Sequence, residues 1–223
     1  DWRVVCANLA MTMASIRNQT SDRWVAYICG QDRPVGVAFD AQVRFVPFRQ
    51  IVYRPNEKGV RGWDKGDKRR RLLNRILRDF KGRDGYYAQW DADDLLHPDV
   101  VKHVVAGNNG RGYLADKGMI ADLGARRYGE ISPVAATGKQ KAFWRLSGSS
   151  SFVRFDFRTQ PAHWKRLLER HSSHVKLVDW QAAHGLPLEM IPFHAAIYGY
   201  AHGENLSALK GSDRGIYFEV NPL

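Results

Sequence analysis

The chain has 223 residues, 44% of them hydrophobic and 26% charged, and Lys plus Arg outnumber Asp plus Glu by 34 to 23. These fractions are typical of a soluble globular domain, and no apolar run in the sequence is long enough to cross a bilayer. The formal net charge of +11 favours an anionic partner, such as a nucleotide, a phosphorylated lipid, an anionic membrane or a nucleic acid.

The two cysteines indicate the compartment. Cys6 and Cys29 each lie inside an apolar stretch, so we expect buried free thiols in a reducing compartment, not a disulfide framework or a metal site. We therefore expect a cytoplasmic protein. The positive charge leaves open a peripheral contact with the anionic inner face of a membrane.

Strands and helices are predicted to alternate in the first half of the chain. The expected helices cover 9–18, 68–82 and 98–105, and the expected strands cover 24–29, 43–48, 51–53 and 86–90. The helix at 68–82 is the clearest, because its leucines, Ile76 and Phe80 fall on one face and its arginines mostly on the other. Such alternation predicts an α/β fold with a mostly parallel, doubly wound central sheet flanked by helices, whose ligands bind beyond the carboxyl ends of the strands.

The second half is less regular and predicts a small antiparallel element. We expect a hairpin over 112–122, a strand at 149–155, a helix at 161–170, and short strands at 175–178 and 188–191. No linker or repeat separates the halves. We therefore expect a single domain over residues 1–223, in which the second half completes the sheet and forms the other side of a cleft.

An acidic cluster follows the predicted strand at 86–90. Residues 86–98 read Tyr-Tyr-Ala-Gln-Trp-Asp-Ala-Asp-Asp-Leu-Leu-His-Pro, and they place Asp91, Asp93 and Asp94 together. Carboxylates this close repel one another unless a cation lies among them, and a divalent cation can also hold a phosphate. On an extended backbone Asp91 and Asp93 would point to the same side. The alternative is that all three are solvated loop or helix-cap residues.

Four stretches resemble a known family. The segment Trp-Asp-Ala-Asp-Asp-Leu-Leu-His-Pro resembles the Asp-x-Asp segment of GT-A fold glycosyltransferases, especially the family-2-like group. Three more stretches agree with that family in order, at 13–20, 24–32 and 68–77. The resemblance covers 9–106 well and the rest loosely. It implies a GT-A type, Rossmann-like fold, with a nucleotide-sugar-binding half at 1–106 and an acceptor-binding half at 107–223.

The resemblance also implies roles for five residues in the first half. Asp93 would bind a Mn²⁺ or Mg²⁺ ion that bridges the donor diphosphate, and Asp91 would contact the ribose or the metal and its water shell. Asp32 would face the base of a nucleotide sugar, most simply a UDP-sugar, and Lys68 and Arg71 would lie near the diphosphate. The alternatives are a turn residue for Asp32 and a solvated helix face for the two cations.

Three residues of the second half and Asp94 receive roles in the same way. Asp179 follows a short apolar run, and the resemblance implies the general base, with Trp180 as a platform for a sugar; the alternative for Asp179 is a helix N-cap. His202 resembles a late metal ligand carried by a loop, and its imidazole would suit Mn²⁺ better than Mg²⁺. Asp94 either assists the site or caps the next helix.

The start of the chain departs from the family pattern. Val4–Cys6, the expected first strand, leads almost directly through Asn8 into the first helix, so the loop that normally contacts the nucleotide is short. We therefore assign no base-binding residue there.

The resemblance as a whole implies a metal-dependent glycosyltransferase of the hexosyltransferase type. It would transfer a sugar from a nucleotide sugar to a glycan or lipid-linked saccharide, with inversion, in polysaccharide biosynthesis. One alternative is a Mg²⁺-dependent nucleic-acid-processing enzyme or a nucleic-acid-binding protein, although the basic residues are scattered and we expect no nucleic-acid partner. The other is a sugar-binding or scaffold domain whose acidic cluster is structural.

Overall fold

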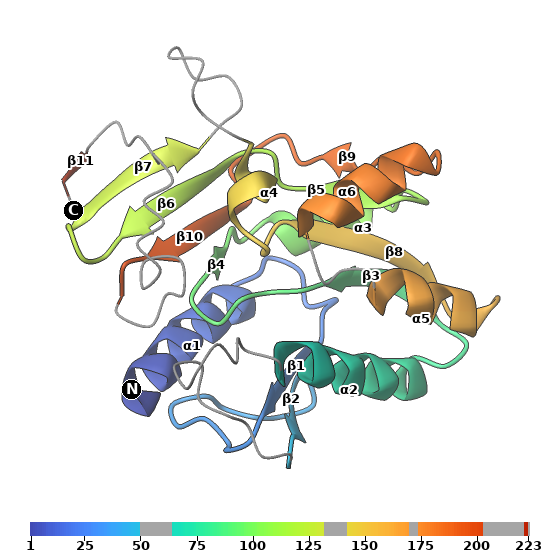
Figure 1. Cartoon of the computed structure of the whole chain (residues 1–223), viewed down its shortest axis with the longest axis horizontal. Helices are drawn as coiled ribbons and strands as arrows, with labels where there is room; N and C mark the ends of the chain where they lie inside the picture. Colours follow the sequence, from blue (N-terminus) through green and yellow to red (C-terminus); the bar gives the residue numbers. More distant parts are fainter. Residues whose placement is uncertain (50–63, 132–141, 170–173, 203–220, 223) are drawn as a thin grey trace, which may run out of the picture.

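A computed structural model describes residues 1–49, 64–131, 142–169, 174–202 and 221–222 (Figure 1). The expected strand at 51–53, and the first part of the polar segment that follows it, lie outside these residues. In Figure 1, α1 and α2 occupy the lower half of the molecule with β1 and β2, and the longer strands form the upper half.

Six helices are described. Their bounds are α1 Trp2–Arg17, α2 Asp64–Asp79, α3 Val100–Gly107, α4 Phe143–Leu146, α5 Pro161–Glu169 and α6 His174–Ala183. No helix in the described part of the chain is long and apolar enough to span a membrane.

The described strands form three sheets. The first pairs β1 (Ala26–Gly30) with β2 (Val43–Pro47). The second has the order β11-β7-β6-β10-β4, with bounds β4 Leu95–Leu96, β6 Gly118–Asp122, β7 Arg127–Ile131, β10 Ala196–Tyr200 and β11 Asn221–Pro222. The third has the order β3-β8-β5-β9, with bounds β3 Asp84–Ala88, β5 Gly112–Leu114, β8 Ser151–Asp156 and β9 Glu189–Met190.

The α/β class is confirmed, and so is an antiparallel element in the second half. The expectation of one mostly parallel central sheet is wrong for the described strands. Only β1–β2, β6–β10 and β5–β9 pair in parallel, and the other five pairs are antiparallel. The reason is that strands of the second half insert beside those of the first: β8 pairs with β3, and β10 pairs with β4. Neither pairing is visible in the local alternation of elements.

Helix α1 replaces the expected strand at Val4–Cys6. The helix begins directly after Asp1, whose side chain accepts a hydrogen bond from the Arg3 backbone N–H at 2.8 Å. Leu9 and Met13, one turn apart, pack with Val43 of β2 in an apolar cluster. The expected strand is therefore the first part of a helix whose buried apolar residues, Cys6, Leu9 and Met13, have the spacing of one helical face.

Two predictions in the second half are also wrong. The expected strand at 175–178 is the first part of α6, where Leu177 and Trp180 face one apolar cluster while Val175 and Val178 face another. Both pairs have the three-residue spacing of a helix. The expected hairpin at 112–122 is instead two strands, β5 and β6, that belong to different sheets.

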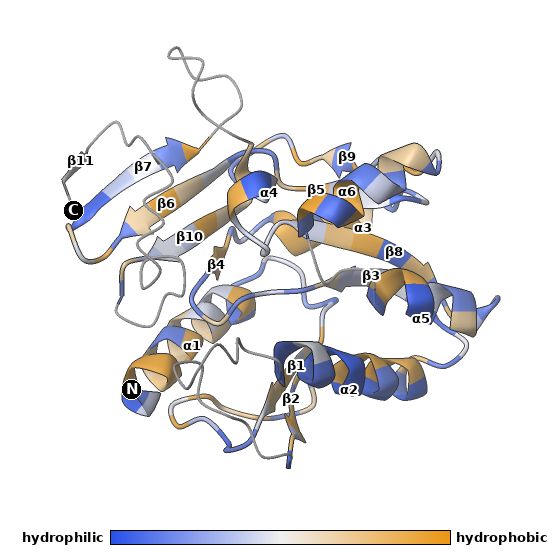
Figure 2. Ribbon diagram, in the orientation of Figure 1, coloured by the Kyte–Doolittle hydropathy of each residue, from blue (hydrophilic) through white to orange (hydrophobic). Residues whose placement is uncertain are grey.

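Helix α2 confirms the clearest sequence prediction and begins four residues earlier than expected. Leu73 is buried, and Ile76 and Phe80 pack against the apolar cluster that contains Tyr87 and Phe155. The rest of the helix is strongly hydrophilic, as its blue colour in Figure 2 shows. The helix thus presents one apolar face to the third sheet and leaves its cations on the remaining faces.

Candidate functional site

The acidic cluster lies in a turn just beyond the end of β3. The Asp94 N–H donates to the Asp91 carbonyl at 3.4 Å, and the Trp90 Nε1–H donates to the Asp94 carbonyl at 3.1 Å. The expectation that Asp91 and Asp93 point to one side of an extended backbone is therefore wrong. Pairing of β3 with β8 stops at Ala88, so the chain is free to turn before it reaches the first carboxylate.

Asp94 is fully buried and holds this turn against two other segments. Its Oδ2 accepts a hydrogen bond from the Ser147 hydroxyl and its Oδ1 accepts one from the Gly199 N–H, each at 3.0 Å. Burial, with help from the charge of Asp93, raises the pKa of Asp94 to about 7. Asp94 does not cap the next helix, whose N-cap residue is Asp99. Its two hydrogen bonds join the acidic turn to Ser147 and Gly199, so the observed role of Asp94 is structural.

Asp93 and His202 meet across a separation of 109 residues, with His202 Nε2 2.8 Å from Asp93 Oδ2. The His202 side chain is 6% exposed and that of Asp93 is 22% exposed. Burial raises the pKa of Asp93. Gly199 permits this approach, because a Cβ there would lie 2.3 Å from the Asp93 carbonyl oxygen. The structure thus brings together two of the three residues that the sequence singled out as metal ligands, and the third, Asp91, lies close enough for its charge to act on Asp93.

Asp91 is half-exposed and surrounded by polar groups. Lys65 Nζ lies 2.8 Å from its Oδ1, and its backbone N–H donates to the Ser149 hydroxyl at 2.9 Å. Arg69 lies one helical turn after Lys65 and is partly buried. Burial lowers the pKa of its guanidinium, and the negative charge of Asp91 acts in the opposite direction. Two cations from the first turns of α2 therefore lie on the Asp91 side of the turn.

His174 is one of the residues of this site that sequence reasoning missed, together with Lys65, Arg69 and Asn8. It is the first residue of α6, and burial lowers the pKa of its imidazole, which favours the neutral form. A Cβ at Gly148 would lie 3.5 Å from Asp91 Oδ2 and 3.7 Å from His174 Nδ1. Asp91 and His174 therefore approach the same small space beside Gly148. The expected strand at 175–178 hid the helix start that positions this histidine.

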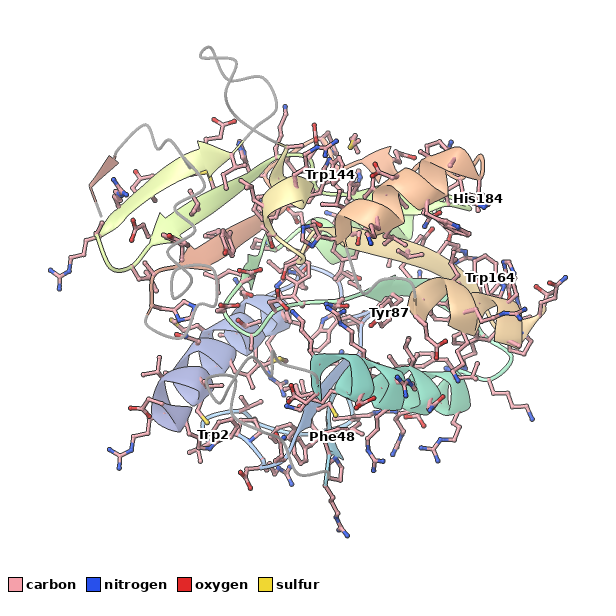
Figure 3. The ribbon with its side chains drawn as sticks, in the orientation of Figure 1. Trp2, Phe48, Tyr87, Trp144, Trp164 and His184 are labelled. Atoms are coloured by element: carbon pink, nitrogen blue, oxygen red, sulfur yellow. The ribbon has the colours of Figure 1, made fainter. Side chains whose placement is uncertain are left out.

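The other predicted cations face a different side of α2. Lys68 forms an ion pair with Asp64 at 2.5 Å and lies 5.8 Å from the Phe48 ring. Burial raises the pKa of the Cys29 thiol, and the positive charges of Lys68 and Arg71 oppose that rise, so both cations lie near Cys29. Arg71 also lines a groove of about 750 Å³. In Figure 3, Phe48 and Tyr87 lie on opposite sides of α2. The described contacts of Lys68 and Arg71 are thus with the side of β1 and β2, while Lys65 and Arg69 face Asp91.

Asp32 is exposed and lies two residues beyond the end of β1. It therefore lies near the carboxyl ends of the two parallel strands, on the same side of α2 as Lys68 and Arg71. This is the edge of a parallel pair where ligands are expected.

Asp179 does not open a helix, as the sequence had suggested, but is the sixth residue of α6 and is exposed. Its N-cap alternative is therefore wrong. Trp180 is half-buried, packs against the cluster that contains Leu177, and stacks on His184 with ring centroids 4.1 Å apart. These contacts leave it little area as a platform for a sugar.

Within the described residues, no group of three or more His, Cys, Asp or Glu side chains is arranged to hold a metal ion. The protein offers the pair Asp93 and His202, with Asp91 beside it. Two protein ligands are enough for a cation that takes its remaining ligands from substrate phosphates and water.

No protein-family model matches the chain, and no curated protein matches it. The family resemblance of the sequence therefore stays a prediction. The function has to be argued from the geometry of the acidic turn and its neighbours.

Proposed function

We propose that this chain is a metal-dependent glycosyltransferase that uses a nucleotide sugar, most simply a UDP-sugar. One observation carries the proposal: Asp93 and His202, which are far apart in the sequence, meet at 2.8 Å on a turn beyond a strand end. Asp91 and the cations Lys65 and Arg69 lie beside them. A hard cation prefers carboxylate and phosphate oxygens, so this mixture of charges suits a diphosphate held through a metal.

The spacing of the two ligands fits a Mn²⁺ or Mg²⁺ ion. Ligand atoms about 2.1 Å from a metal and at right angles to each other lie about 3 Å apart. The Nε2–Oδ2 distance of 2.8 Å between His202 and Asp93 is close to that value. When bound, the ion would neutralise the charge that grows on the departing nucleotide diphosphate. Asp91 would orient a water of the ion or the ribose.

The donor would extend from the acidic turn along the start of α2. Lys65 and Arg69 would face the diphosphate, since they are the α2 cations nearest Asp91. Asp32 would contact the base near the end of β1, with Lys68 and Arg71 on that side of the helix. Charge from these side chains, already oriented by the fold, would stabilise the leaving group without further rearrangement.

The experiment that tests the proposal is calorimetry with UDP on the parent chain, with and without Mn²⁺. We expect UDP binding that requires Mn²⁺ and is abolished by a chelator. If UDP does not bind and DNA or RNA binds with a steep salt dependence, the glycosyltransferase proposal fails and the nucleic-acid alternative replaces it. Binding of neither would favour a structural role for the acidic cluster.

The acceptor would be a glycan or a lipid-linked saccharide, activated by a general base. The sequence proposes Asp179 for this role, and the geometry adds His174, which approaches Asp91 and is held in its neutral form. A neutral imidazole can accept the acceptor's proton, and general base catalysis contributes roughly 10²–10⁴-fold.

The variants His174→Gln and Asp179→Asn distinguish the two candidates. We expect His174→Gln to lose about 10²-fold or more in transfer rate while it keeps UDP binding, because it removes the neutral imidazole that lies near Asp91. Asp179→Asn, on the exposed side of the same helix, should keep most of its transfer rate. Donor binding by calorimetry and transfer by nucleotide release measure the two effects, and the reverse pattern would return the role to Asp179.

A further inference from the structure

Asn8 on α1 is buried, 8% exposed, and lies behind the metal pair. Its side-chain nitrogen Nδ2 is 3.1 Å from His202 Nδ1, and His202 Nε2 is 2.8 Å from Asp93 Oδ2. The three side chains therefore form a continuous chain of contacts, Asn8 to His202 to Asp93. It links the N-terminal helix to the acidic turn.

The contact with Asn8 fits one tautomer of His202. In the orientation that the structure gives the Asn8 amide, its nitrogen faces His202 Nδ1 and can only donate, so Nδ1 accepts and is unprotonated. The proton of a neutral imidazole is then on Nε2, where it is donated to Asp93 Oδ2. Every hydrogen bond in this arrangement is satisfied, but the Nε2 lone pair that a metal needs is not available.

We propose that Asn8 positions His202 for metal binding. When the ion binds, the Asn8 amide group rotates so that its oxygen faces His202 in place of its nitrogen. For Nε2 to ligate the ion, the imidazole proton must be on Nδ1, and Asn8 must then present Oδ1 to accept it. The shift is a change of tautomer with no net gain or loss of a proton. Asp93 exchanges the lost hydrogen bond for the bond to the ion.

This inference rests on the proposed metal site and extends it to a residue outside the ligand set. A metal-bound histidine generally donates its other ring N–H to a fixed acceptor, and loss of that acceptor typically lowers metal affinity about 10–100-fold. An asparagine can serve both states, because its amide offers a donor and an acceptor at similar positions. A carboxylate at position 8 would offer only the acceptor, and an apolar side chain would offer neither.

The first test compares Asn8→Leu with a matched control on the same helix. Asn8→Leu keeps the branched shape of the side chain and removes both the donor and the acceptor, and we expect Mn²⁺-dependent UDP binding to weaken about 10–100-fold by calorimetry. The control is Thr12→Val, one turn further along α1. Thr12 is 2% exposed and its hydroxyl has no hydrogen-bond partner in the described structure, so binding should stay within about twofold.

The second test uses the parent chain and does not depend on whether a variant folds. The ring ¹⁵N shifts of His202, identified with His202→Gln, report which nitrogen carries the proton. We expect the proton on Nε2 without metal and on Nδ1 after addition of UDP and Zn²⁺, a diamagnetic substitute for Mn²⁺.

The outcomes separate this inference from the proposed function. A proton already on Nδ1 without metal, or no change of tautomer with metal, would overturn the role of Asn8, as would parent-like binding by Asn8→Leu; the metal site would remain in each case. Failure of the parent chain to bind metal and UDP at all would overturn both.

Discussion

Asp93→Asn is expected to abolish Mn²⁺-dependent UDP binding while the protein stays folded. The amide keeps the shape of the side chain but removes the negative charge that a divalent ion requires, so we expect a loss of about 100-fold or more in affinity. Burial raises the pKa of Asp93, which means that its charge costs folding free energy, and its removal should not lower the melting temperature. Calorimetry with UDP and Mn²⁺ measures the first effect, and thermal unfolding measures the second.

Asp156→Asn is the matched control, since Asp156 is the last residue of β8 and forms an ion pair with Arg158 at 2.7 Å. The variant changes the net charge by the same amount as Asp93→Asn does. It lies at the end of β8 that is farther from the acidic turn. Its UDP affinity should equal that of the parent chain. If Asp93→Asn and Asp156→Asn bind UDP equally well, Asp93 holds no ion and the proposed function loses its main support.

Asp94 is expected to make the protein less stable as the pH rises from about 4 to about 7. Its carboxyl group has a pKa of about 7 in the folded protein, against 3.8 for an exposed aspartate. The folded state therefore binds more protons than the unfolded state in this interval, so the free energy of unfolding is highest below the lower pKa and falls until the upper pKa is passed. A shift of this size corresponds to about 4 kcal/mol.

Asp94→Asn should remove that contribution. The amide can accept from the Gly199 N–H and donate to the Ser147 hydroxyl, much as the protonated carboxyl group does. Denaturant unfolding of both proteins should show similar stability near pH 4 and a more stable variant at pH 8, by up to about 4 kcal/mol. A difference between parent and variant that does not change with pH would show that Asp94 is not the titrating group. Asp94→Ala should be less stable at both pH values, because it leaves the buried Gly199 N–H and the buried Ser147 hydroxyl without their partner.

The local features of this chain could be predicted from the sequence. Helix α2 has an unbroken 3.6-residue pattern of apolar side chains, and the acidic turn follows an aromatic strand, so both follow from neighbouring residues. The family resemblance named both Asp93 and His202 as metal ligands, and the two side chains lie in contact. In each case the informative residues lie within one short segment or one recognisable motif.

The remaining features depend on contacts between distant segments. Pairing of β8 with β3 and of β10 with β6 is set by side chains that meet only in the folded chain. The sequence did not predict that Asn8 belongs to the site, because the apolar residues around Val4 also suit a strand. It did not predict His174 either, because α6 divides its apolar side chains between two clusters and so lacks a single apolar face. A short apolar run fits a strand and a buried helix equally well, and only its packing decides between them.

The contacts around the acidic turn join parts of the chain that are made at very different times. The hydrogen bond between Asn8 and His202 spans 194 residues, and that between Asp94 and Gly199 spans 105. Closing such long loops is slow, because chain entropy is lost before the contact can compensate for it. During synthesis on the ribosome, the acidic turn therefore exists long before its partners emerge. A nascent chain that ends before His202 holds these carboxylates without the imidazole, so the proposed metal site can form only after the ribosome has made the chain through His202.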